Sequence, residues 1–179
     1  MQIRLRPVLL SLLLLVVVGG VISYFQPKDI PKSSVTVENF AQDECQQDGV
    51  TLVVDFGTNN KTETLVRCAI DFSGSGWELF KATGIEAEGT ASYPIGFVCR
   101  IAGYPTELNQ DCQDTPKYSE GSWGYYQLNE QGKWQVSGVG SAFSKPKCGL
   151  AEGWRFIEPG EDVADLAPRI IPEVRVCSD

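Results

Sequence analysis

The chain opens with a long apolar segment. Between Arg6 and Lys28 lie 21 residues without a charge, and more than half of them are Leu, Val or Ile. As a helix this segment would span about 30 Å, the thickness of a bilayer core. Arg4 and Arg6 precede it and favour a cytoplasmic N-terminus. Residues 1–25 are therefore predicted to form a signal-anchor helix that holds the rest of the chain outside the cytoplasm.

A cleaved signal peptide is the alternative for residues 1–25. Val21-Ile22-Ser23 offers a cleavage site, although the apolar run is longer than such peptides require. The protein is expected either in the cell membrane, as a single-pass protein with its C-terminal domain outside, or secreted. The sequence leaves the cleavage open.

The pattern changes after this segment. Residues 26–44 contain prolines, charges and serines, and predict an extended, solvated linker. Residues 45–179 are bracketed by Cys45 and Cys177 and have the alternating apolar character of a single folded domain.

Most of the domain has the pattern of β-strands. An apolar, β-branched run at 49–56 predicts a strand buried on both faces, and alternation at 63–69 predicts its antiparallel partner. Residues 129–132 are typical of a hairpin turn. The further predicted strands are 86–92, 95–101, 124–128, 133–136 and 153–157.

One segment predicts a helix, at residues 75–84. Ser73 or Ser75 can cap its start, Trp77 and Phe80 share a face, and Gly84 stands where a helix-terminating glycine belongs. The expected fold is α+β and mostly β, with a mixed or antiparallel sheet, one covering helix and three disulfides.

Composition and charge exclude several classes of function. The 179 residues include no histidine, which excludes Ser-His-Asp and Cys-His catalysis and histidine metal sites. Without Arg4 and Arg6, 13 basic residues remain against 23 acidic ones, a net charge of −10. Binding to nucleic acid is not expected from such an acidic domain.

Six cysteines, Cys45, Cys68, Cys99, Cys112, Cys148 and Cys177, predict disulfides in an exported domain. No pair has C-x-x-C spacing, so neither a zinc ribbon nor a redox motif is indicated. Of the 15 pairings that six cysteines allow, the sequential one is the simplest: 45–68, 99–112 and 148–177. Each bridge would contribute about 3 kcal/mol in the chain-entropy model.

Motifs for catalysis are weak. Ser144-Lys-Pro-Lys147 matches S-x-x-K, but Pro146 opposes the helix that this chemistry uses. Gly74-Ser-Gly76 precedes a helix without the remainder of a P-loop. Asn60-Lys-Thr62 is a glycosylation sequon on a turn, whose use depends on the host. We expect no enzyme and no catalytic residues.

Acidic residues gather in two places. Asp111 and Asp114 flank Cys112, and a second set lies at residues 158–165. Calcium uses such carboxylates, yet neither set has EF-hand spacing, so a solvated acidic surface is the expectation and no metal site is assigned.

Aromatic residues concentrate in the predicted hairpin and in the strand after it. Alternation places Trp123 and Tyr125 on one face and Tyr126 on the other. Rings that remain exposed would form a stacking platform for a flat organic ligand or a protein; rings that do not would be core. The candidate ligand-binding residues are Trp123, Tyr125, Tyr126, Trp134 and Trp154.

The order of these features resembles a known family. The segments that carry the resemblance are 77–84, 96–103, Trp123-Gly-Tyr-Tyr126, Gly132, 138–140 and Glu152-Gly-Trp-Arg-Phe156. Together they resemble the C-terminal domain of the transcobalamin and intrinsic factor family, and more closely still a group of short exported actinobacterial proteins with Cys-x-Asp-Thr-Pro, here Cys112–Pro116. The resemblance covers roughly residues 49–157.

The resemblance implies a ligand but not a complete carrier. In the family this domain and a large helical domain enclose cobalamin, and here the helical domain has no counterpart. Glu152-Gly153 replaces the family's Gly-Asp, and the cysteines are additional. The expected function is a non-catalytic extracytoplasmic binding module, with a corrinoid-type ligand and a membrane transporter as candidate partners and no resident cofactor. The alternative is an envelope interaction or structural protein without a small ligand.

Overall fold

The computed structural model describes residues 40–117 and 119–178. The predicted signal segment 1–25 and most of the linker lie outside these ranges. Within them no helix combines the length and the apolar character that crossing a membrane requires.

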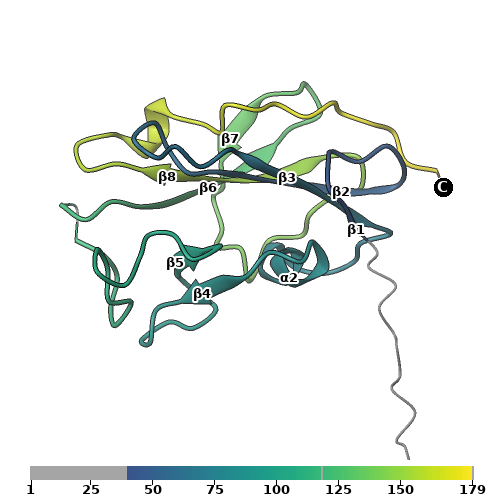
Figure 1. Ribbon diagram of the computed structural model, residues 1–179. Coiled ribbons are helices and arrows are strands. Elements are labelled where there is room, and N and C mark those ends of the chain that lie inside the picture. The colour runs from purple at the N-terminus through teal and green to yellow at the C-terminus, as the bar shows by residue number, and fades with distance from the viewer. Residues whose placement is uncertain (1–39, 118, 179) are drawn as a thin grey trace, which may run out of the picture. The chain divides into compact units, whose positions relative to one another are not determined.

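Nine elements besides one short 3-10 helix make up the described domain (Figure 1). A six-stranded sheet has the order β1-β3-β2-β8-β6-β7, and β4 and β5 pair in a small second sheet. The bounds are β1 Phe40–Ala41, β2 Gly49–Asp55, β3 Leu65–Ile70, α2 Gly76–Ala82, β4 Ala87–Gly89, β5 Val98–Ile101, β6 Ser122–Leu128, β7 Trp134–Val136, β8 Ala151–Ile157 and the 3-10 helix Val163–Asp165.

The large sheet is mixed. Its central pair, β2 and β8, is parallel, and its other neighbouring pairs are antiparallel. Both central strands are buried along their whole length. The expected fold, mostly β with one short helix and three disulfides, is therefore what the structure has.

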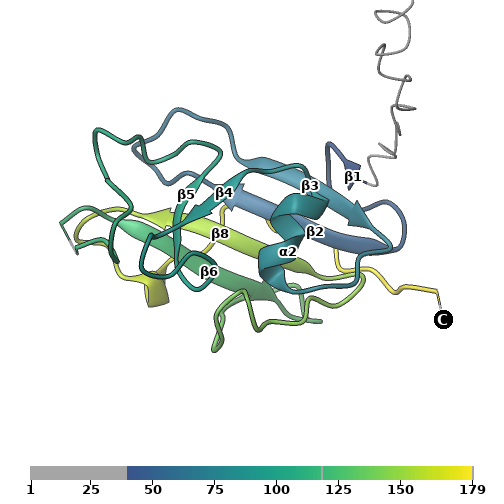
Figure 2. The same cartoon turned by 90° about the horizontal axis from the view of Figure 1, so that it is seen from below.

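One face of the sheet packs on α2 and the small sheet, which lie side by side beneath it (Figures 1 and 2). The core between these layers contains Leu52 and Val54 of β2, Leu79 and Phe80 of α2, and Trp154 of β8. The opposite face of the sheet is covered as well. Strand β2 is therefore buried on both faces, which explains its continuous apolar run.

The C-terminal segment covers the opposite face (Figure 1). Asp55, wholly buried, accepts hydrogen bonds from Arg155 Nη1 at 3.1 Å and Arg169 Nη2 at 2.6 Å. The Tyr126 hydroxyl donates to the Val163 carbonyl at 3.0 Å. These contacts fasten the segment after β8 across the sheet.

Local signals explain α2. Ser75 accepts the Glu78 amide hydrogen bond, and the Glu78 carboxylate accepts from the Ser75 amide at 2.8 Å, which is a complete capping box. Gly84 has a φ of 67°, the left-handed conformation that ends helices and that glycine adopts without strain. The predicted helix is confirmed, slightly shortened.

The predicted disulfides are confirmed. Cys45 bonds to Cys68, Cys99 to Cys112 and Cys148 to Cys177. The first pair lies where the antiparallel strands β2 and β3 bring their ends together, and the last attaches the C-terminal segment to the loop before β8.

Two strand predictions and part of the linker prediction need correction. The strand predicted at 86–92 is confined to Ala87–Gly89, and the one at 95–101 to Val98–Ile101. Tyr93 to Phe97 form a turn, in which the amides of Gly96 and Phe97 donate to the Tyr93 carbonyl. Part of the predicted linker is also ordered, because Phe40–Ala41 pairs with β3.

Candidate functional site

The structure places most of the predicted aromatic site in the core. Trp123, Tyr126 and Trp154 are 7%, 1% and 4% exposed. Tyr125 stacks on Trp154 with ring centroids 4.6 Å apart. Trp134 is half-buried, and its indole N–H donates to the Ile170 carbonyl at 3.0 Å.

Of the two alternatives for these rings, an exposed stacking platform or a packed core, the burial favours the core for most of them. Alternation is as expected, with Trp123 and Tyr125 facing the helix and Tyr126 facing away. The C-terminal segment covers the face of the sheet that carries Tyr126. Ligand binding by these five residues stays a prediction, which their burial does not favour.

A cavity of about 730 Å³ lies instead between α2 and the small sheet. We call it the α2–β4 cleft. Its walls combine apolar side chains with a charged rim: Trp77, Phe80, Ile85 and Ala87 are apolar, and Glu78, Lys81, Glu86, Glu88 and Arg100 are charged. Apolar walls with a few polar groups are the usual make-up of a small-molecule site.

The aromatic wall of the cleft is supported from behind. Trp77 meets Phe80 edge-on, with ring centroids 5.9 Å apart, and Phe80 rests against Trp154 at 5.4 Å. Trp77 is half-buried, whereas Phe80 is buried. The buried rings thus support a partly exposed Trp77 at the cleft, which favours stacking on a ligand.

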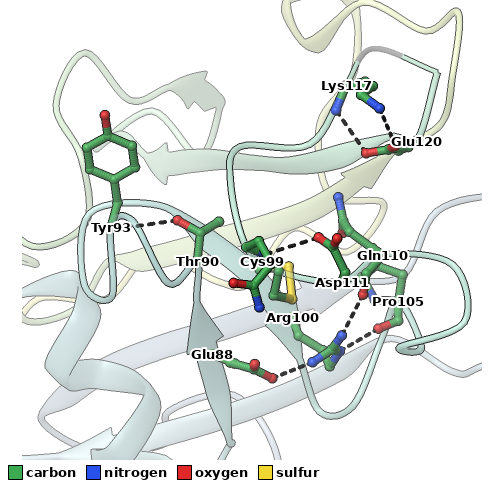
Figure 3. The surroundings of a disulfide bond; sticks show 12 residues. Glu88, Thr90, Tyr93, Cys99, Arg100, Pro105, Gln110, Asp111, Lys117 and Glu120 are labelled. Carbon is green, nitrogen blue, oxygen red and sulfur yellow. Dashed lines mark hydrogen bonds and ion pairs between the residues drawn. A yellow bond between two sulfur atoms is a disulfide. The ribbon is translucent and has the colours of Figure 1, made fainter.

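Arg100 lines the cleft, and Figure 3 shows its guanidinium beside Glu88, Pro105 and Gln110. Its guanidinium donates to the Pro105 carbonyl at 2.7 Å, the Glu88 carboxylate at 2.5 Å and the Gln110 carbonyl at 2.8 Å. With these acceptors, Arg100 is a structural clamp rather than a free site for an anion. The rim carries three carboxylates against two cations, so the cleft suits neutral or cationic ligands better than anionic ones.

A second polar cluster surrounds Glu152, which is 3% exposed. The Tyr125 hydroxyl donates to one carboxylate oxygen, and Gln127 Nε2 donates to the other at 3.2 Å. Burial raises the pKa of Glu152 to about 7, although both hydrogen bonds lower it. Burial and the neighbouring carboxylate raise the pKa of Tyr125, so its hydroxyl stays protonated and cannot serve as a base.

The S-x-x-K motif lacks the helix on which catalytic Ser-Lys pairs are placed. The segment 144–147 is not helical, and the buried Ser144 hydroxyl lies 2.6 Å from that of Tyr125 and accepts the Gly76 amide at 3.1 Å. Lys147 is exposed and lies 3.8 Å from Glu130. Ser144 therefore joins the loop to α2.

Asp55, Arg155 and Arg169 form a further charged cluster. It lies on the face of the sheet that the C-terminal segment covers. Burial alone would raise the pKa of Asp55, but hydrogen bonds from Arg169 and the Gly57 amide, together with the charge of Arg155, hold it below the usual value. All its partners come from the domain itself, so we interpret it as a structural fastening.

Sequence reasoning missed the cleft and the burial of Glu152. Trp77 and Phe80 were assigned only to a packed helix face. One sequence feature could have indicated the cleft. Trp77 stands in the first turn of a short helix, where a ring as large as an indole is only partly covered by the core. Glu152 gave no signal, because its burial depends on strands β6 and β8 being neighbours.

A comparison of the chain with protein-family models, with curated proteins and with solved structures finds no match.

Proposed function

We propose that this protein is a non-catalytic, extracytoplasmic binding module whose ligand site is the α2–β4 cleft. The observation that carries the proposal is the half-buried Trp77, which packs against the buried Phe80 at the wall of a cavity of about 730 Å³. The three disulfides support an oxidising, extracytoplasmic location.

The ligand class follows from the lining. An apolar body fits against Trp77 and Ile85, while hydrogen-bond donors or a cationic group reach the Glu86 and Glu88 carboxylates. Amide-bearing, cofactor-like molecules have this combination. The resemblance to transcobalamin C-terminal domains makes corrinoids the first to test and a membrane transporter the receiving partner; both are part of the proposal.

Calorimetric titration tests it with the full chain in lipid nanodiscs. Cobalamin, cobinamide and a panel of other vitamins are the probes. Trp77→Ala is expected to weaken binding about tenfold or more, a loss of about 1.4 kcal/mol. Trp134→Ala is the matched control, because Trp134 is also half-buried but lies on the tail side of the sheet. Failure of every probe to bind, or equal effects of the two substitutions, would reject the cleft as the site.

The alternative, an envelope interaction protein, is favoured by one observation. Phe143 is 80% exposed and Val139 51% exposed in the loop between β7 and β8. Photo-crosslinking from position 143 in cells distinguishes the two functions: a crosslinked envelope protein together with no vitamin binding would favour this alternative.

A further inference from the structure

An acidic hollow lies in the loop that follows β5. It has a volume of about 400 Å³. Its lining includes four carboxylates and one ammonium group, from Glu107, Asp111, Asp114, Glu120 and Lys117. This negative surface alone would be an ordinary solvated loop, as the sequence indicated.

Gln110 distinguishes the hollow from a solvated loop. Gln110 is among the residues that line the hollow, yet it is only 6% exposed and its amide group is buried. Among the described residues, neither its amide oxygen nor its amide nitrogen has a hydrogen-bond partner. A buried amide without partners costs free energy, and such a group in a native fold calls for an explanation.

The position of Gln110 is fixed by its backbone. Its carbonyl accepts a hydrogen bond from Arg100 Nη2 at 2.8 Å, and its amide donates to the Thr106 carbonyl at 3.1 Å. The disulfide between Cys99 and Cys112 holds the same loop two residues later. Figure 3 shows the Gln110 and Asp111 side chains between Arg100 and the segment that carries Lys117 and Glu120.

The carboxylates around Gln110 retain free oxygens. Asp111 Oδ1 accepts the Gln113 amide at 3.1 Å, and Asp114 Oδ1 accepts the Ser92 hydroxyl at 2.5 Å. The second oxygen of each carboxylate has no partner in the described residues. Carboxylate and amide oxygens are the ligands of calcium, which takes six to eight of them in flexible arrangements.

We propose that this hollow is a calcium site, with Asp111, Asp114 and the amide oxygen of Gln110 as ligands. The carboxylates are not gathered beforehand: in the described part of the loop no three of them lie within 4.8 Å of one another. Binding therefore rotates side chains inward around the ion. The affinity should be that of extracellular calcium modules, with a Kd on the order of 0.1–1 mM.

Thermal unfolding of the full chain in zwitterionic lipid nanodiscs tests the proposal. Millimolar calcium chloride is expected to raise the Tm by a few degrees, whereas magnesium chloride at equal ionic strength does not. Asp111→Asn with Asp114→Asn should abolish the increase. Asp162→Asn with Asp165→Asn is the matched control from the second acidic set and should retain it.

Gln110→Leu separates a ligand from a structural residue. As a ligand, Gln110 can be replaced by leucine without loss of Tm in the absence of calcium, but the calcium-induced increase disappears. Gln110→Glu supplies an oxygen ligand and should restore the increase, which keeps the test valid if the leucine variant folds poorly. No calcium-induced increase in the wild type, or an equal increase in the Asp111/Asp114 variant, overturns the proposal.

Discussion

Replacing Glu152 by glutamine should make the domain more stable at alkaline pH. Glu152 is buried between β6 and β8 with both oxygens hydrogen-bonded, and its folded-state pKa is about 7 against an ordinary value of 4.5. Because the folded state holds the proton more tightly than the unfolded state does, protonation stabilises the fold. This stabilisation is fully present below pH 4.5 and is lost as the pH rises through 7.

The magnitude follows from the two pKa values. A pKa raised from 4.5 to about 7 corresponds to about 3 kcal/mol between the fully protonated and fully ionised limits. About 2.5 kcal/mol of this falls between pH 5 and pH 8. Glutamine cannot ionise, and its amide oxygen can still accept a hydrogen bond from Tyr125 or Gln127. The variant therefore does not lose this stability as the pH rises. Its stability relative to the wild type should rise by about 2.5 kcal/mol across that range.

Urea unfolding at pH 5, 6, 7 and 8, followed by tryptophan fluorescence, measures this difference. Comparing variant with wild type at each pH cancels the titration of every other group. Glu130→Gln is the control, because Glu130 lines the same polar pocket as Glu152 but its side chain is 72% exposed. The stability of this variant should follow the wild type at every pH. A Glu152→Gln difference that does not change with pH would refute the assignment of a buried, protonated carboxyl.

Two further substitutions test the fastening of the C-terminal segment. Asp55→Asn removes the wholly buried charge that pairs with Arg155 and Arg169 and should cost roughly 3–5 kcal/mol in urea unfolding at pH 7; a cost below about 1 kcal/mol would mean that these ion pairs do not hold the segment. Cys148→Ser with Cys177→Ser opens a 29-residue loop and should cost about 3.5 kcal/mol. Hydrogen exchange at the Arg175 amide, which donates to Gly149, should accelerate in this variant; unchanged protection would contradict a role of the disulfide in docking the segment.

Local patterns predicted the elements of this fold well. Ser75 and Gly84 delimit α2, the glycine turn at 129–132 gives the hairpin, and the β-branched run gives β2. The three disulfides also followed from order along the chain, because each joins segments that the hairpins or loops return to one another. These features depend on short-range geometry.

Contacts between segments far apart in the sequence could not be predicted from these local patterns. The parallel pairing of β2 with β8 joins Leu52 to Glu152 across 100 positions, and nothing local specifies it. The same holds for Asp55 and Arg169. The contact between Asp55 and Arg169 helps to close the second face of the sheet. Tyr126 is therefore core, whereas Trp77, on the helix, remains half-buried at the cleft.

The predicted bounds of the short strand β5 were wrong for a different reason. Residues 95–101 have the apolar character of a strand, but Pro94 and Gly96 belong to a turn that consumes the first half of the run. Turn chemistry competed there with β-propensity and prevailed.

The most direct test of the central claim, that the α2–β4 cleft is the binding site, is a fluorine NMR titration of the full chain labelled with 5-fluorotryptophan. The four resonances report on distinct places: Trp77 in the cleft, Trp123 and Trp154 in the core, and Trp134 beneath the C-terminal segment. Addition of the corrinoid and vitamin panel should shift the Trp77 resonance and leave that of Trp134 in place. A bound ligand that shifts Trp134 and not Trp77, or no shift with any ligand in the panel, would contradict it.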